Sequence, residues 1–398
     1  MKITILGGSS PFIIDFFLNF NKEFYTYDNV VIFKLFGRNK KSLNLIKSYL
    51  EKKFLDNKYC VEIYTDLIES IIDTDIIVNQ IRFGGLDGRK DDELFAKKIN
   101  TIPDETLGPC GLKAALRLNS YLMNLSSIVT KYSTHKFFIN MINPLSISTS
   151  ILTKNGVKNC IGVCELPKVT INQFLKLTNL SDENIKYDYY GLNHRGFFFN
   201  LRIEDELINL KKILNRKEIY FNGISVDEII ELNAIPLKYW KVLNGKPVSY
   251  LGRSDFLSEL GNKIFQALEY ESDKVELLLS ERSMPWYKEA LIPVIKTIAY
   301  RDSNTHILNI HNNEIGYTEE IEVVFSESNL KIKKSKELPS NLEKIIENFS
   351  NHEINTLRAI EEKSLDNIYL AINSDPMLKK VDSKEKYYIA NLILNANI

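Results

Sequence analysis

The sequence predicts an α/β fold in which a Rossmann-like, doubly wound parallel sheet is followed by an α+β domain. Through the first 165 residues, short runs rich in Val, Ile and Phe alternate with helical stretches, as they do in buried parallel sheets. The first run leads straight into a glycine-rich turn, Gly7–Pro11. After Pro167 the alternation stops, and strands that are close together in sequence give way to longer helices, which indicates a second, mixed unit.

The first half, residues 1–165, is predicted to be a dinucleotide-binding domain. Its strands are expected at Lys2–Leu6, Val30–Phe36, Val61–Tyr64, Asp75–Gln80, Lys136–Ile142 and Asn159–Val163. Its helices are expected at Phe12–Asn21, Lys40–Phe54, Leu112–Lys131 and Ser146–Lys154. Strand and helix alternate in this order because each parallel strand needs a crossover to reach the next.

The second half, residues 166–398, is predicted to be a substrate, metal and oligomerisation domain like the C-terminal domain of lactate and malate dehydrogenases. Asp188–Leu192 and Gly196–Ile203 are close enough to form an antiparallel hairpin, and Ile321–Phe325 is a further strand. Helices are expected at Asp227–Leu232, Ser254–Glu269 and Trp286–Tyr300, and from Ser340 to the end with a break at Asp375-Pro376. No low-complexity linker separates the halves, so we expect them to be docked together.

Composition excludes several classes of protein. Lysine plus arginine and aspartate plus glutamate number 51 each, which argues against a nucleic-acid or membrane-surface partner. No basic and apolar leader and no apolar run long enough to span a membrane is present. The four cysteines form no Cys-x-x-Cys pair. We therefore expect a cytoplasmic protein with reduced thiols.

The turn after the first strand predicts a nucleotide site. Small residues at Gly7, Gly8, Ser9 and Ser10 allow the backbone to approach a pyrophosphate at a helix N-terminus. An ordinary strand-to-helix turn remains the alternative, because the full G-x-G-x-x-G is missing. The second strand is followed by Arg38 where an acid usually holds the ribose of NAD; since an arginine accommodates the 2′-phosphate of NADP, the choice between the two cofactors stays open.

Charged and polar residues follow the later strands, at the edge where such sheets bind ligands. Arg82 and Arg89 come after the fourth strand beside two glycines, and such a pair can hold an anion such as a phosphate. The alternative is a solvated charged loop. Asn143, in Asn143-Pro144 after the fifth strand, is a candidate for a sugar hydroxyl or a simple turn residue.

Cys164, at the end of the sixth strand, and His194, thirty residues later, are candidate metal ligands. Thiolate and imidazole both suit a divalent transition metal. Each residue alone is more often a buried core residue. A nucleotide fold that also offers these two ligands suggests redox chemistry at a sugar carbon.

Taken together, these motifs resemble glycoside hydrolase family 4, the NAD- and divalent-metal-dependent glycosidases, over about residues 1–320. The matching segments are Asn79–Gly85 with Arg89 and Asp92-Glu93, Glu105–Gly111, Asn143-Pro144, Cys164–Pro167, Gly191–His194, Ile235–Tyr239, Arg282–Ala290 and Asn312-Asn313. The chain departs from the family pattern in its shortened glycine turn, in Arg38, in Cys110 where a glycine is usual, and in Glu165 after the cysteine.

The resemblance implies roles for these residues. Asn79 contacts the cofactor, Cys164 and His194 bind Mn²⁺ or another divalent metal, and Glu105, Asn143 and Arg282 line the sugar site. The implied reaction is oxidation at C3 of the sugar by NAD, loss of the C2 proton, elimination of the glycosidic oxygen, addition of water and re-reduction.

The resemblance also names the groups that move protons. Tyr239 is the implied base at C2 and Glu165 the implied proton donor to the leaving oxygen, with orientation of Cys164 as the alternative role of Glu165.

Two other function classes remain open, an NAD(P)-dependent hydroxy-acid or sugar dehydrogenase and a non-catalytic sugar- and nucleotide-binding homologue. If Arg82, Arg89 and Arg282 converge, the substrate is an anionic sugar, a 6-phosphate or a uronate. The expected partner is this small molecule alone, bound by a homodimer or homotetramer.

Overall fold

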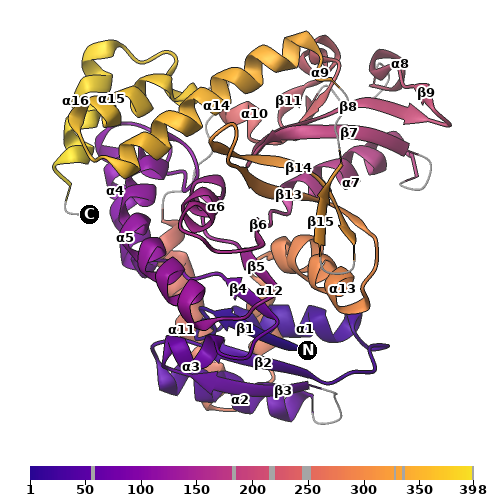
Figure 1. The fold of residues 1–398 in the computed structure, drawn as a ribbon, viewed down its shortest axis with the longest axis vertical. Helices are drawn as coiled ribbons and strands as arrows, with labels where there is room; N and C mark the ends of the chain where they lie inside the picture. The colour runs from indigo at the N-terminus through magenta and orange to yellow at the C-terminus, as the bar shows by residue number, and fades with distance from the viewer. Residues whose placement is uncertain are drawn as a thin grey trace.

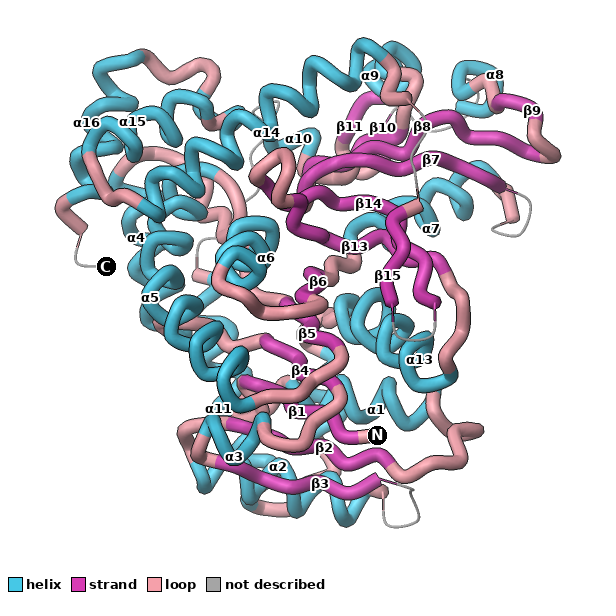
Figure 2. The backbone as a smooth tube through the Cα atoms, viewed as in Figure 1, coloured by secondary structure: helices cyan, strands magenta, loops and turns pink. Residues whose placement is uncertain are grey.

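The computed structural model describes residues 1–54, 59–181, 185–214, 220–243, 252–326, 329–333 and 337–396. Its backbone forms one long twisted sheet with helices on both faces (Figures 1 and 2). The N-terminal strands lie at one end of the sheet and the hairpin of the second half lies at the other.

The N-terminal half contains the predicted doubly wound parallel sheet, with strand order β3-β2-β1-β4-β5-β6. The strands are β1 (Lys2–Leu6), β2 (Val31–Phe36), β3 (Tyr59–Tyr64), β4 (Ile76–Asn79), β5 (Phe137–Asn140) and β6 (Cys160–Gly162). Leu6 is in register with both Phe36 and Asn79, so the carboxyl ends of the three central strands meet at one edge. Ligands of doubly wound sheets bind at this edge.

The same sheet continues into the second half with antiparallel strands. β13 (Thr305–Asn312) pairs with β6 through Asn309 and Gly162. Beyond β13 the order is β14 (Tyr317–Ser326), β7 (Ile185–Leu192), β8 (Arg195–Ile203) and β12 (Ile235–Pro236), with β9 (Glu206–Leu207) on β8 and β15 (Asn329–Ile332) on β14. The short pair β10 (Tyr220–Phe221) and β11 (Ile224–Ser225) stands apart. One sheet therefore runs across residue 165, and the boundary placed there stays a prediction.

The helices of the first half cover the parallel sheet. They are α1 (Ile13–Glu23), α2 (Lys40–Lys53), α3 (Leu67–Ile71), α4 (Gly85–Lys98), α5 (Gly108–Tyr132) and α6 (Leu145–Lys154). No helix was predicted for the segment after β4, and the solvated loop given as the alternative is wrong from Gly85 onward, where α4 begins. Local propensity there is poor because of Gly85 and Gly88, but tertiary ion pairs from Asp92 to Arg117 and Lys113 hold the helix.

The helices of the second half are α7 (Leu166–Thr178), α8 (Leu210–Leu214), α9 (Val226–Leu232), α10 (Trp240–Leu243), α11 (Arg253–Glu269), α12 (Val275–Ser280), α13 (Ile292–Tyr300), α14 (Ser340–Glu361), α15 (Leu365–Ser374) and α16 (Ser383–Leu394). A 3₁₀ turn at Pro376–Leu378 marks the expected break. The predicted helix Trp286–Tyr300 divides into a π-helical turn, Tyr287–Leu291, and α13. Sequence patterns did not predict α7 or β13.

The largest hydrophobic core joins the two halves of the chain. It contains Ile3 and Phe33 from the parallel strands, Leu260 from α11 and Ile295 from α13. Figure 1 shows α11 beside α2, and the two helices are in contact although they are far apart in the sequence. None of the described helices is long and apolar enough to cross a membrane.

Candidate functional site

The glycine turn joins the ends of β1 and β2. Gly7 has a φ of 95°, which glycine adopts at little cost, and the backbone N–H groups of Gly7 and Gly8 donate to the carbonyl of Phe36 at 3.1 and 2.8 Å. A Cβ on Gly8 would lie 2.8 Å from the Cβ of Leu35, so only glycine fits there. Ser9 and Ser10 follow the glycines and lie just before α1, whose N-terminus favours an anion.

Asn79, at the end of β4, lies inside the sheet. Its side chain is fully buried and its amide donates to the Oδ1 of Asn140 at 3.3 Å, across the β4–β5 pair. Its own Oδ1 has no hydrogen-bond partner. The next residue, Gln80, accepts a hydrogen bond from the hydroxyl of Tyr287 at 2.9 Å. The structure thus shows the Asn79 side chain as part of the inner packing, and its contact with a cofactor stays a prediction.

Four guanidinium groups, Arg82, Arg89, Arg253 and Arg282, form what we call the arginine cluster. Partial burial is the main cause that lowers the pKa of Arg82. The nearby charges of Arg89, Arg282 and Arg253 lower it further, so these groups lie close to Arg82. Convergence of Arg82, Arg89 and Arg282 was predicted; the part of Arg253, at the start of α11, was not. Like charges that converge in one place create a site for an anion.

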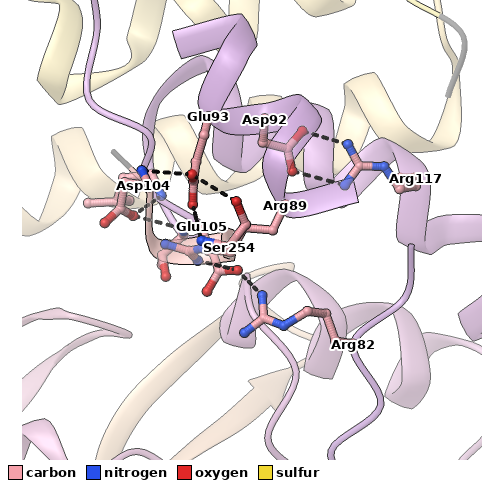
Figure 3. A network of polar contacts seen from close by, with 11 residues as sticks. Arg82, Arg89, Asp92, Glu93, Asp104, Glu105, Arg117 and Ser254 are labelled. Carbon is pink, nitrogen blue, oxygen red and sulfur yellow. Dashed lines mark hydrogen bonds and ion pairs between the residues drawn. The ribbon is translucent and has the colours of Figure 1, made fainter. Parts of the chain in front are cut away.

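Glu105 ties two members of the cluster together (Figure 3). It forms ion pairs with Arg82 and with Arg89, the latter at 2.5 Å. Arg89 also donates to Glu93 at 3.0 Å, and only 8% of its side chain is exposed. Glu93 in turn accepts hydrogen bonds from the backbone of Gly252 and Ser254 at the start of α11. Arg89 is therefore partly a structural residue, whereas 38% of the Arg82 side chain is exposed.

Arg282, another member of the cluster, packs against two aromatic rings. Its guanidinium lies 4.3 Å from the ring centroid of Phe12 and 5.0 Å from that of Trp286. Its Nε is buried without a hydrogen-bond partner, and burial lowers its pKa to about 10. Since Phe12 immediately precedes α1, Arg282 connects the arginine cluster to the end of the glycine turn. A buried donor without a partner is costly in a protein that binds nothing there.

His194 belongs to the two-residue turn of the β7–β8 hairpin. Its φ of 66° is uncommon for a residue with a side chain, and such strain is often kept at functional sites. The side chain is buried, and burial, with the charges of Lys238 and Arg195, lowers its pKa to about 3. The imidazole is therefore neutral, and its Nδ1 is buried without a partner.

Cys164 lies beside this turn. The side chain of Asn193 hydrogen-bonds its thiol, and Glu165 Oε2 lies 3.9 Å from its Sγ. Burial is the main cause that raises the pKa of Cys164 well above its usual value, and the neighbouring carboxylates Glu165 and Glu320 add to it. Burial also raises the pKa of Glu165, which Lys238 opposes. Asn193 thus connects both candidate metal ligands, because it precedes His194 in the turn and hydrogen-bonds Cys164. The sequence analysis gave it no role.

These two residues fit a divalent transition metal. A neutral imidazole with a free nitrogen is the form that binds a metal, and a metal can displace the proton of a buried thiol. Across the described ranges, no group of three or more His, Cys, Asp or Glu side chains gathers as a metal site. The protein would therefore contribute two ligands, and the remaining positions would be open to a bound molecule.

Tyr239 packs against the candidate ligands. It follows the edge strand β12, and its ring centroid lies 4.3 Å from that of His194 with an interplanar angle of 32°. Its hydroxyl donates a hydrogen bond to the carboxyl of Asp104. Asp104 is buried and also accepts the backbone N–H groups of Thr106 and Leu107 at 2.8 and 2.9 Å. The sequence singled out Glu105 but missed its neighbour Asp104.

A second buried carboxyl lies behind the hairpin turn. Glu320 on β14 accepts hydrogen bonds from the hydroxyl of Tyr189 at 2.5 Å, from Asn309 at 2.9 Å and from Asn193 at 3.4 Å. Burial raises its pKa to about 7. It supports Asn193 and so the turn that carries His194. In β14, Glu320 lies on the face opposite Ile321 and Val323, so the alternation of the strand did not indicate that this acid is buried.

Two predicted site residues lie on the surface. Asn143 is exposed and precedes α6 after β5, and Arg38 is exposed after β2. Both are at the carboxyl edge of the parallel strands, as predicted. Neither makes a side-chain hydrogen bond or ion pair within the described part of the chain, so both are available to a ligand.

Comparison with known proteins identifies the chain's relatives. Residues 2–180 match the model of the family 4 glycosyl hydrolases. The match covers somewhat less than half of the chain. The resemblance drawn from the motifs is thereby confirmed.

Characterised relatives extend the family match at low identity. The chain is 23% identical to a 6-phospho-β-glucosidase of Thermotoga maritima over 327 residues, 79% of this chain and 77% of that protein. It is 26% identical to the maltose-6′-phosphate glucosidase of Bacillus subtilis over 51% of this chain. That second match spans 46%, about half, of the relative's length.

Several solved structures share the fold of this chain. The Thermotoga maritima 6-phospho-β-glucosidase has a TM-score of 0.82 at 19% identity, covering 99% of this chain and 98% of that one. A 6-phospho-α-glucosidase from gut microorganisms, in complex with NAD and Mn²⁺, has a TM-score of 0.82 at 18% identity, covering 100% and 98%. A malate dehydrogenase of Plasmodium falciparum follows with a TM-score of 0.50 at 12% identity, covering 93% and 100%. The predicted fold class, a Rossmann unit with a malate-dehydrogenase-like second half, is confirmed.

Proposed function

We propose that this chain is a family 4 glycosidase that cleaves a 6-phosphorylated glucoside with the help of NAD and a divalent metal such as Mn²⁺. One observation carries the proposal: two consecutive residues join the two parts of the site. Asp104 holds the hydroxyl of Tyr239, and Glu105 holds Arg82 and Arg89. The arginine cluster and the Cys164–His194 turn are thus adjacent, as a sugar with an anionic end requires.

The chain's own residues can move and hold the protons that the reaction requires. Bound NAD would supply reversible oxidation at a sugar carbon, and a metal on Cys164 and His194 would supply Lewis-acid stabilisation of negative charge. Tyr239, which packs on His194 and is oriented by Asp104, would act in its phenolate form as the base at C2 of the sugar, and a nearby divalent metal would favour the phenolate. Glu165, whose pKa is raised by burial, can keep a proton for the leaving oxygen.

The arginine cluster supports a phosphorylated substrate over a neutral one. Arg82 is partly exposed and Arg282 has an unpartnered Nε, so both have donors for an incoming oxyanion, whereas Arg89 is held between Glu93 and Glu105. Relatives at low identity are 6-phospho-glucosidases, and one solved relative was captured with glucose-6-phosphate. A uronate would satisfy the same charges and is the competing substrate.

A panel of nitrophenyl glycosides tests the proposal. The purified protein, under reducing conditions with NAD and Mn²⁺, is offered α- and β-glucosides with and without a 6-phosphate, and a galacturonide. We expect nitrophenol release from a 6-phosphorylated glucoside only, with no net accumulation of NADH. Net NADH release without nitrophenol would instead identify a dehydrogenase, and no turnover despite cofactor binding would identify a non-catalytic homologue.

The proposal includes the assembly and location expected from the sequence, a homodimer or homotetramer in the cytoplasm. Light scattering of the purified protein at several concentrations tests the assembly. A monomer at every concentration would contradict it.

A further inference from the structure

The end of β2 is the place where a doubly wound sheet distinguishes NAD from NADP. Dinucleotides lie across the carboxyl ends of the central strands, and the adenosine ribose reaches the end of the second one. Here Leu6, Phe36 and Asn79 are in register, and the glycine turn bonds to the carbonyl of Phe36. The residues that follow Phe36 therefore face the ribose of any dinucleotide that this fold binds.

The residues that directly follow Phe36 offer no acid for the ribose hydroxyls. Gly37 has no room for a side chain, because a Cβ there would lie 2.5 Å from the Cβ of Ser9 and 2.6 Å from its Oγ. Asn39 is used as the N-cap of α2, where its Oδ1 accepts the N–H of Ser42 at 3.1 Å. The next acid along the chain is Glu51. Only Arg38 is left to face the ribose.

Several positively charged side chains lie at and just after Arg38. Arg38 is exposed and forms no ion pair within the described residues. The first turn of α2 contains no acid and begins with Lys40 and Lys41, although positive charge is disfavoured at a helix N-terminus. Lys41 is paired with Glu269, whereas Lys40 has no ion pair in the described ranges. A dianion placed here would meet Arg38, Lys40 and the helix N-terminus together.

Two stacked aromatic rings lie near Arg38. Phe83, in the loop after β4, stacks on Tyr121 of α5 with ring centroids 5.1 Å apart and an interplanar angle of 18°. The charge of Arg38 reaches Tyr121, and Phe36 and Ile81 belong to the same partly buried apolar group. Phe83 is 36% exposed. A flat, open, apolar surface beside a guanidinium suits an adenine ring whose ribose carries a phosphate.

We propose that the adenosine end of the cofactor site accepts a 2′-phosphate through Arg38, so that the chain binds NADP at least as tightly as NAD. This inference rests on the proposed function only in requiring that a dinucleotide binds. The hydride taken from the sugar is returned within each turnover, so the 2′-phosphate changes recognition and leaves the chemistry unchanged. Nothing in this pocket involves the metal or the sugar.

Calorimetric titration of the full-length protein tests the inference without turnover. NAD⁺, NADP⁺, AMP and adenosine 2′,5′-bisphosphate are each titrated into the wild type, Arg38→Ala and Lys47→Ala. Lys47 is the matched control, because it lies on the same helix α2 and pairs with Glu51. We expect NADP⁺ to bind at least as tightly as NAD⁺. Arg38→Ala should weaken NADP⁺ and the bisphosphate by about ten- to a hundredfold and change NAD⁺ and AMP less than threefold.

Each outcome has a defined meaning. Tighter NAD⁺ binding in the wild type, or an equal loss of both cofactors in Arg38→Ala, overturns the inference and leaves the proposed NAD-dependent function in place. Failure of both dinucleotides to bind overturns the proposed function and this inference with it. A similar loss in Lys47→Ala would show a general electrostatic effect and would also overturn the role of Arg38.

Discussion

The arginine cluster and the Cys164–His194 turn are neighbours with opposite electrostatics. In the cluster, several positive charges are held close together near the carboxyl ends of the parallel strands, and burial together with the neighbouring charges lowers the pKa of Arg82 and of Arg282. At the turn, burial favours the uncharged forms of the imidazole, the thiol and the carboxyl of Glu165. The contrast separates two tasks: stored positive charge recognises an anion, whereas neutral, dehydrated groups are ready to bind a metal or hold a proton.

Removal of a ligand at the turn should have the largest effect. We expect His194→Ala and Cys164→Ser each to lower turnover by about a thousandfold or more, or roughly 4 kcal/mol of transition-state stabilisation, because each leaves a single protein ligand. Titration of Mn²⁺ should show lost binding, while dinucleotide binding changes little. Cys160→Ser is the control, because Cys160 lies in β6 shortly before Cys164 and is also buried. Normal activity of either ligand variant in the presence of a chelator would refute the metal assignment.

The Asp104–Tyr239 contact connects the two regions, so its loss should be next in size. Tyr239→Phe removes the proposed base and should lower kcat by about a hundred- to ten-thousandfold. Asp104→Asn keeps the shape but weakens the hydrogen bond to the phenol and should lower kcat by about ten- to a hundredfold, with KM nearly unchanged. Asp91→Asn, an exposed carboxyl on α4, is the control. A change in KM alone would show that Asp104 only shapes the substrate pocket.

Neutralising single arginines should affect recognition before stability. Arg82→Met and Arg282→Met should each raise KM for the phosphorylated substrate by about ten- to a hundredfold, the value of a charge-assisted bond, and reduce discrimination against the neutral glycoside. Arg89→Met should also lower the melting temperature, because Arg89 is buried between Glu93 and Glu105.

Arg117→Met provides the contrast for these variants, since Arg117 pairs with Asp92 outside the cluster. We expect it to lose stability with unchanged discrimination. If Arg82→Met and Arg282→Met behave like Arg117→Met, the cluster is structural and the anion binds elsewhere.

The smallest expected effect is on the pH dependence of the free energy of unfolding. It arises because burial behind the turn disfavours the charged form of Glu320. The pKa of Glu320 is raised to about 7 from 4.5. A carboxyl with a raised folded-state pKa contributes stability below pH 4.5 that is lost as the pH rises through 7. The stability of wild type relative to Glu320→Gln should therefore fall on the order of 2–3 kcal/mol from pH 4.5 to pH 8. Urea unfolding across this range measures it; a constant difference would contradict the raised pKa.

The buried histidine changes stability in the opposite direction over part of this range. The pKa of His194 is lowered to about 3 from 6.5, so its contribution is present above pH 6.5 and is lost as the pH falls through 3. Comparison with Glu320→Gln at each pH removes this contribution, because both proteins retain His194.

The sequence predicted the parallel half better than the antiparallel half for a physical reason. In the parallel half, short apolar strands alternate with helical crossovers, and this alternation marks β1 to β6 in the sequence. The carboxyl ends of these strands lie at one edge of the sheet, so the residues that follow them lie near one another. This is why Arg38, Arg82 and Asn143 could be placed. The helix α4 could not be predicted, because its stability comes from Asp92 and Glu93 bonding to distant residues, and local patterns do not encode such contacts.

The same limit explains the site residues that were missed. Asp104, Asn193 and Glu320 act through each other or through Tyr189 and Tyr239. Asn193 lies within the matched segment Gly191–His194, but no motif gave any of the three a role, because their importance arises from burial in hydrogen-bond networks. Arg253 joins the cluster only because Glu93 on α4 fixes the start of α11. Candidate metal ligands could be named from a resemblance, but the groups that hold these two side chains in place required a three-dimensional structure.

The uninterrupted sheet has a consequence for how this chain can change in evolution. Residues before 165 share one apolar core with α11 and α13, and β6 continues into β13. A crossover between related genes near residue 165 would therefore separate Ile3 and Phe33 from the partners that complete their packing, Leu260 and Ile295. The halves are poor candidates for modular exchange. New specificities are more readily acquired by substitutions in the loops, where Arg38 and Arg82 stand, than by inheriting a foreign second half.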